Sequence, residues 1–207
     1  MKIRIAVSIG AMALAGLWVA GTAWGQAGTH LGHVKDSWND TPGKVGLVTI
    51  LEDEAKTAAA HAGFANPCNL GAMKTHTPHV RQAIDASTES GGPGKGYGVA
   101  KAAMGVAAHM DFARKSGDAS DSLKLHSEHI ISAANNIVAW SAEIITLSGK
   151  VQDAMDKSGA AGAMKDIQAR TQWIINGNDA NGDGKISWQK GEGGLAQLKQ
   201  HLGFIQQ

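Results

Sequence analysis

Apolar residues recur at spacings of three and four along the chain from about residue 45 onward, within Ala-rich stretches. Such spacing is typical of amphipathic helices, because 3.6 residues per turn bring those positions onto one face. Alternating β-branched runs, which indicate strands, are almost lacking. The pattern therefore predicts an all-α fold, with helices over residues 45–64, 70–86, 97–115, 120–147, 151–176 and 194–204.

The start of the chain has a different pattern. Lys2 and Arg4 precede an unbroken run of apolar and small residues that ends near residue 25. A short basic region before such a run is typical of a secretory signal peptide. We expect residues 1–25 to be this signal, with cleavage near residues 23–27. The mature protein is then periplasmic or secreted, and no membrane contact is expected after cleavage.

Residues 26–44 precede the periodic region, and we expect an extended N-terminal segment there. Trp38 is expected to anchor this segment on the helices. His30 and His33 form an HxxH pair, which either covers a ligand site, binds metal as an arm, or lies exposed. Because we find no repeat of this pair together with its surroundings, we expect it to be exposed.

An internal repeat carries six of the nine histidines. The stretch Ala-Ala-His-Ala-Gly-Phe-Ala at 59–65 recurs at 107–113 as Ala-Ala-His-Met-Asp-Phe-Ala, with five of seven positions identical. In each copy an HxxH pair follows on the next predicted helix. The simplest account is a duplicated helical hairpin, with copies over about 45–90 and 97–148. Residues 45–148 would then form a pseudo-twofold four-helix bundle.

The spacing predicts where these imidazoles meet. Histidines three residues apart share one face of a helix, and the single histidine of each first helix lies at a similar level on its antiparallel neighbour. With both hairpin turns at one end of the bundle, all six would gather there. The candidate ligands are His61, His76 and His79 in the first copy, and His109, His126 and His129 in the second.

Neutral imidazoles are ligands for copper, zinc and iron ions. Opposed histidines on a helical bundle can instead hold a haem, which would be non-covalent because the chain contains no CxxCH sequence. A third alternative is that these histidines are structural and bind nothing. The sequence therefore predicts a transition-metal or haem site and leaves the ligand open.

Composition excludes several classes of protein. The chain without its predicted signal has 17 basic and 18 acidic side chains, which argues against an extended nucleic-acid surface. The single cysteine, Cys68, forms no internal disulfide, and we expect it to be an unpaired loop thiol. We find no Ser/His/Asp or Cys/His arrangement typical of a hydrolase, and the sequence leaves any protein partner unknown.

The most specific short motif lies near the C-terminus. Residues 179–187 read Asp-Ala-Asn-Gly-Asp-Gly-Lys-Ile-Ser, between two predicted helices. This stretch resembles the EF-hand calcium loop, and the resemblance covers about residues 163–205. Lys190 stands where the family has a bidentate Glu, so Glu192 would replace it only if the loop is longer or the exiting chain bends at Gly191. The resemblance implies calcium ligands at Asp179, Asn181, Asp183, Lys185 (backbone carbonyl), Ser187 and Glu192.

The sequence thus favours a four-helix bundle at 45–148 followed by a single EF-hand-like calcium module at 149–207. Its predicted function is that of an exported calcium-binding protein whose bundle holds copper, zinc or iron, or a haem. One alternative is a non-catalytic, calcium-dependent interaction module with structural histidines. Another is a small periplasmic copper or haem oxidoreductase or electron carrier. The pattern favours a binding protein over an enzyme.

Overall fold

A computed structural model describes residues 25–206, which fold into seven α-helices and one short 3-10 turn and contain no strand. The prediction of an all-α fold is confirmed. The predicted signal peptide lies outside the described residues except for Gly25. The helices are α1 (Gln26–Lys35), α2 (Leu47–Phe64), α3 (Leu70–Ile84), α4 (Val99–Lys115), α5 (Asp121–Asp153), α6 (Lys157–Asn176) and α7 (Leu195–Phe204), with η1 at Pro42–Lys44.

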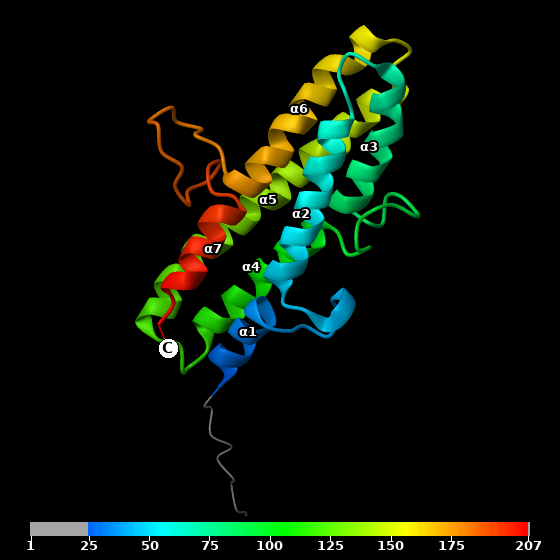
Figure 1. The fold of residues 1–207 in the computed structure, drawn as a ribbon. Helices are drawn as coiled ribbons and strands as arrows, with labels where there is room; N and C mark the ends of the chain where they lie inside the picture. Colours follow the sequence, from blue (N-terminus) through cyan, green and yellow to red (C-terminus); the bar gives the residue numbers. More distant parts are fainter. Residues whose placement is uncertain (1–24, 207) are drawn as a thin grey trace, which may run out of the picture.

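The helices form two groups arranged end to end along α5, the longest helix (Figure 1). One group lies at the second half of α5, where α3 and α6 pack on α5 and α2 packs on α3 and α6. The other lies at the first half of α5, where α4 and α7 pack on α5 and α1 packs on α4. The turns of the α2–α3 and α4–α5 hairpins lie at opposite ends of the molecule. The expectation that both turns share one end is therefore wrong, because α5 is long enough to span both groups.

The helix α5 continues past residue 147, where the sequence predicted its end. Gly149 would weaken an exposed helix by about 1 kcal/mol relative to Ala, but Val151 beyond it is fully buried and holds the last turns in the core. By length and composition alone α5 could cross a bilayer, and half of its most apolar 18-residue window is buried within this fold. That burial is what a core helix shows.

Pro78 lies inside α3 without ending it. A proline has no N–H to donate, so the carbonyl of Lys74, four residues earlier, loses its helical partner. The side-chain amide of Gln152 on α5 donates to that carbonyl at 3.2 Å. Because this bond replaces the missing one, α3 carries both histidines of its HxxH pair on a single helix.

Residues 26–35 form α1 instead of the extended segment that we expected. The burial of Leu31 and Val34 gives this helix an apolar face against α4. Asp118, in the α4–α5 turn, accepts the N–H groups of Gly25 and Ala27 and so caps the helix. At the end of the same turn, Ser120 accepts the N–H of Leu123 and caps α5.

The α4–α5 turn also holds the end of α7. Ser120 Oγ donates to the carbonyl of Gln206 at 2.8 Å, and Ser122 Oγ donates to that of Phe204 at 3.2 Å. The start of α1 and the end of α7 are therefore fastened to the same turn. This arrangement places the histidines of α1, α4, α7 and the first half of α5 at one end of the molecule.

The Gly-rich stretch at 90–96 leads from α3 toward α4, and its end is held by a buried carboxylate. The carboxylate of Glu54 on α2 is fully buried and accepts the N–H groups of Lys95, Tyr97 and Gly98. Satisfying these buried donors stabilises the passage from α3 to α4.

Candidate metal sites

The nine histidines of the chain lie in three groups of three. Each group takes an HxxH pair from one helix and a single histidine from another. We name the groups by their helices: the α1–α4 site, the α2–α3 site and the α5–α7 site. Their members are His30, His33 and His109; His61, His76 and His79; and His126, His129 and His201, respectively.

The same ring atom, Nδ1, points inward in all three groups. In the α1–α4 site the Nδ1 of His109 lies 3.0 Å and 3.4 Å from those of His30 and His33. In the α2–α3 site both distances from His61 are 3.1 Å. In the α5–α7 site the distances from His201 are 3.1 Å and 3.2 Å. Three nitrogens each about 2.0 Å from one tetrahedral metal ion are about 3.3 Å apart, so the spacing fits an ion.

Hydrogen bonds alone do not satisfy these clusters. A neutral imidazole has one protonated nitrogen and one nitrogen with a single in-plane lone pair. The central histidine of each group faces two other Nδ1 atoms, so one proton satisfies only one of the two contacts. A cation at the centre would accept all three lone pairs at once. The geometry therefore fits three metal ligands better than a chain of hydrogen bonds.

The α2–α3 site brings together the three histidines that the sequence assigned to the first hairpin. The second hairpin differs from the prediction: His109 meets the α1 pair, while His126 and His129 meet His201 on α7. The spacing within each hairpin predicted the height of each histidine along the helix axis. It did not predict which neighbouring helix each histidine faces. On α4 the adjacent Met110 is fully buried in the core, and His109 turns toward α1.

Three site residues were missed by the sequence analysis. His30 and His33 are partly buried instead of exposed, and His201, which the sequence placed in no predicted site, joins His126 and His129. A signal for them exists. The HxxF sequence at 61–64 and 109–112 occurs a third time at 201–204, and the three HxxH pairs match it in number. Each site therefore combines one HxxF with one HxxH.

The phenylalanine of each HxxF packs beside its site. Phe112 lies 5.2 Å from His30, Phe64 lies 5.5 Å from His76, and Phe204 lies 5.5 Å from His126, measured between ring centroids. About half of each phenylalanine is exposed to solvent. One exposed phenylalanine is ordinary, but the same contact occurs at all three sites, so it belongs to the repeated unit.

The environment keeps the imidazoles neutral, which is the form that binds metal. Burial, and then the neighbouring histidines, lower the pKa of His109 and His201 to about 4. The pKa values of His33, His61 and His129 are lowered for the same reasons. At neutral pH these five side chains therefore present lone pairs instead of positive charges.

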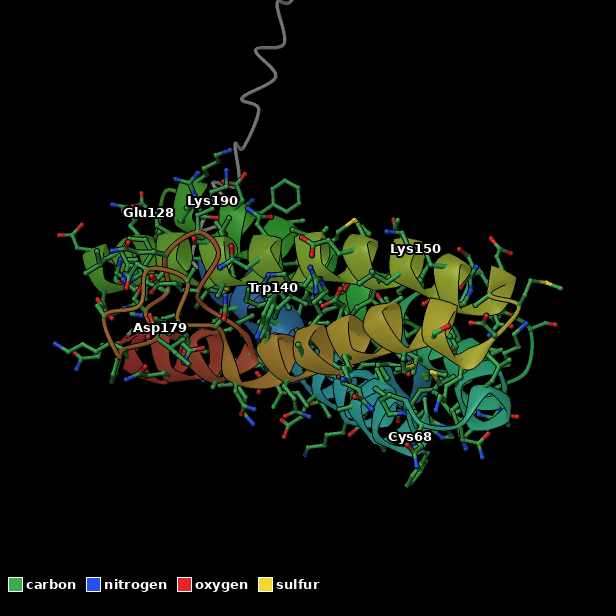
Figure 2. All side chains as sticks on the ribbon, turned by 90° about the horizontal axis from the view of Figure 1, so that it is seen from above. Cys68, Glu128, Trp140, Lys150, Asp179 and Lys190 are labelled. Atoms are coloured by element: carbon green, nitrogen blue, oxygen red, sulfur yellow. The ribbon has the colours of Figure 1, made fainter. Side chains whose placement is uncertain are left out.

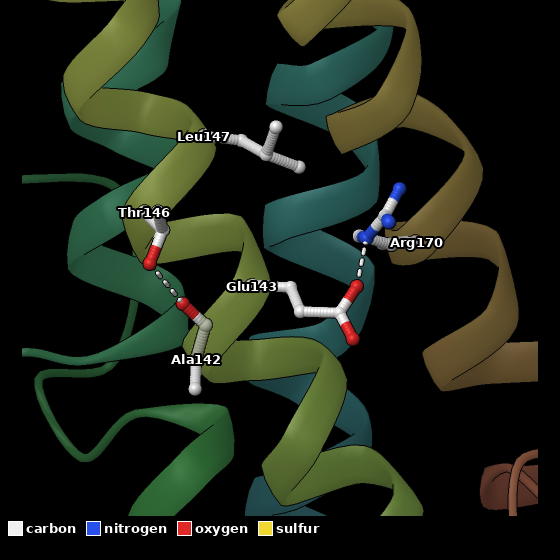
Figure 3. Close-up of a pocket in the computed structure, with 5 residues that line it drawn as sticks. All are labelled: Ala142, Glu143, Thr146, Leu147 and Arg170. Atoms are coloured by element: carbon white, nitrogen blue, oxygen red, sulfur yellow. Dashed lines mark hydrogen bonds and ion pairs between the residues drawn. The ribbon is translucent and has the colours of Figure 1, made fainter.

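The remaining candidates lie apart from these sites. Cys68 is exposed at the edge of the molecule (Figure 2) and joins none of the three groups. A pocket between α5 and α6 is lined by Ala142, Glu143, Thr146, Leu147 and Arg170. Within it Arg170 pairs with Glu143 (Figure 3). Since its two charged groups satisfy each other, this pocket offers no free ligand for a cation.

The EF-hand-like loop lies between α6 and α7, with Asp179 and Lys190 marked in Figure 2. Asp179 accepts three backbone N–H groups, from Gly182, Asp183 and Gly184, and so wraps the loop around its carboxylate. Lys185 is exposed, as a residue that contributes only its backbone carbonyl would be. The exiting helix begins at residue 195, later than the exiting helix of an EF-hand.

The side chain of Glu192 returns to this loop through a bend at Gly191. The chain turns at Gly191, with φ of +85°, and Glu192 is buried. Its carboxylate accepts from Asn181 Nδ2 at 2.8 Å and from Ser187 Oγ at 2.6 Å. A carboxylate thus reaches loop positions three and nine, although Lys190 occupies position twelve.

No protein-family model, curated protein or solved structure matches this chain. The assignment of the sites therefore rests on their geometry and chemistry.

Proposed function

We propose that this protein binds transition-metal ions, one at each of the three histidine sites, as a metal-holding protein. The observation that carries the proposal is the convergence of nine Nδ1 atoms into three triads with spacings of 3.0–3.4 Å from the central histidine. Copper, zinc and iron ions all accept imidazole nitrogen. The predicted signal peptide would place this activity in the periplasm or outside the cell.

An ion fits the triads better than a haem does. Haem iron takes axial ligands from opposite faces of a flat ring, so a third imidazole at the same distance has no place. Three histidines leave an open position at the metal, and catalysis there would also need polar side chains beside that position to move protons or orient a substrate. Since each described site has three histidines and no carboxylate or thiol within ligand distance, we favour metal holding over an oxidoreductase.

Metal content measured after reconstitution tests this function. The purified full chain is expected to bind three equivalents of zinc or copper by native mass spectrometry. His61→Ala, His109→Ala and His201→Ala are each expected to lose one equivalent, and the triple variant all three. Lys150→Ala, a surface change on α5 away from the triads, serves as the control. A wild-type chain that takes up no ion after reconstitution would refute the proposal.

A calcium ion in the EF-hand-like loop is the second proposed ligand. It is supported by the buried carboxylate of Glu192, which supplies the group missing at Lys190. Calcium prefers six to eight oxygen ligands, and the loop offers oxygens from Asp179, Asn181, Asp183, Lys185, Ser187 and Glu192. Asn136 on α5 donates to the carbonyls of Gln189 and Gly193, which fixes the loop on the helices.

We expect calcium to raise the melting temperature by about 3–6 °C at a concentration about ten times its dissociation constant. Asp183→Ala should abolish this increment, because it removes a ligand oxygen, while Lys190→Ala should keep it. Thermal unfolding with calcium and with a chelator measures both. A wild-type melting temperature that is equal under the two conditions would exclude a calcium role for the loop.

A further inference from the structure

Two of the three histidine sites carry a tryptophan that the α2–α3 site lacks. The ring of Trp38, in the segment after α1, lies 4.4 Å from His33 and 4.6 Å from His109, between centroids. Trp188, in the segment before α7, stacks on His129 at 3.9 Å with an angle of 19° between the rings. In both sites the tryptophan contacts the second histidine of the HxxH pair.

The two tryptophans arrive from unrelated parts of the chain. Each stands in a Ser-Trp-Asn/Gln sequence, at 37–39 and at 187–189. In each site the phenylalanine packs on the first histidine of the pair, as described above. At the α1–α4 and α5–α7 sites, aromatic rings thus contact both histidines of the HxxH pair. The repetition of this contact from separate segments indicates a role in the sites beyond filling space.

The imidazole nitrogens that would bind an ion at these sites carry no charge. Among residues 25–206, no carboxylate or thiol joins any triad, and no histidine hydrogen-bonds to a carboxylate. Metal-binding histidines commonly donate their outer N–H to an acidic group that offsets the charge of the ion. The cost of removing an ion from water rises with the square of its charge, so this uncharged environment favours a monovalent ion over a divalent one.

The number of ligands at each site also favours a monovalent ion. Zinc in proteins is almost always four-coordinate, and three histidines leave one position for water. Monovalent copper carries half the charge of a zinc ion and is satisfied by three nitrogens, and copper accepts imidazole. An aromatic face attracts a cation and excludes water, so a neighbouring Trp offers attraction without a fourth ligand.

We propose that the α1–α4 and α5–α7 sites bind Cu(I), with Trp38 and Trp188 as the residues that give them this preference. The inference rests on the proposed metal-binding function. It adds that the three sites are of two kinds, and that the α2–α3 site, without tryptophan, is the less selective one. Trp38 and Trp188 touch the ligand imidazoles and act on the ion as positioning and shielding groups.

An anaerobic titration with Cu(I) against a Cu(I) chelator, followed by tryptophan emission, tests this inference. Two equivalents are expected to change the emission, and a third is expected to bind without a change. Trp38→Leu and Trp188→Leu should each weaken Cu(I) binding at one site by about 5- to 30-fold. The affinity of the same site for Zn(II) should change by less than about twofold. Trp38→Phe keeps a ring and should give a smaller loss.

Trp173→Leu provides the matched control. Trp173 packs on Trp140 and on the guanidinium of Arg170 in α6, and touches no histidine. This variant should leave both metal affinities unchanged. Unaltered Zn(II) binding also shows that the Leu variants keep their triads folded. Equal losses of Cu(I) and Zn(II) affinity would mean that the tryptophans only pack, and would overturn the inference while leaving the metal-binding function intact. Absence of any bound ion would refute both.

Discussion

Replacing His109 by alanine is expected to remove one bound ion. It should also abolish the protection from hydrogen exchange that metal gives to α1. The α1–α4 site joins residues 76 and 79 positions apart in the chain, so an ion bound there would fasten the N-terminal helix to α4. At a free metal concentration about 100 times the dissociation constant, an ion stabilises the docked state by about 2.7 kcal/mol. Loading with metal should therefore slow hydrogen exchange in α1 about 100-fold.

In His109→Ala this slowing should vanish, because two imidazoles of one helix remain without the ligand from α4. His61→Ala is the matched control. It also loses one ion, but the α2–α3 site joins neighbouring helices of one hairpin, only 15 and 18 residues apart. Exchange in α1 should still slow when His61→Ala is loaded. Equal slowing of α1 in wild type and His109→Ala would contradict a metal link between α1 and α4.

The histidine sites show which information the sequence contains and which it lacks. Helical spacing predicted that the two histidines of each HxxH pair share one face of a helix. The HxxF and HxxH sequences each occur three times, which indicates three sites. The partners of each unit were predictable only for the α2–α3 site, where the two helices are adjacent in a hairpin. His109 and His201 find their partners through tertiary packing, which depends on how α1 docks on α4 and how α7 docks on α5.

The N-terminal segment illustrates the same limit. Its ten-residue helix is short for independent stability, so local propensity gives little indication of it. The helix is stabilised by contacts from elsewhere: Asp118 caps its start and α4 covers Leu31 and Val34. The return of the Glu192 carboxylate to the loop, in contrast, was foreseeable, since the glycine beside it permits the bend.

Acidification is expected to destabilise the metal-free protein before its carboxylates titrate. The pKa values of His109 and His201 are lowered to about 4 in the folded state, against about 6.5 in an unfolded chain. Between these values the unfolded state binds more protons, so the free energy of unfolding decreases as the pH falls. The stabilisation is complete above about pH 7 and is lost as the pH falls toward 4.

Both side chains are partly exposed, so solvent screening reduces each contribution to the order of 1 kcal/mol. Together they correspond to a fall of about 4–8 °C in melting temperature between about pH 7 and pH 5. Thermal unfolding of the chelator-treated protein measures this. The double variant His109→Gln and His201→Gln should lose most of the pH dependence, because glutamine does not titrate. A wild type and double variant with the same dependence would show that these two imidazoles do not set the acid response.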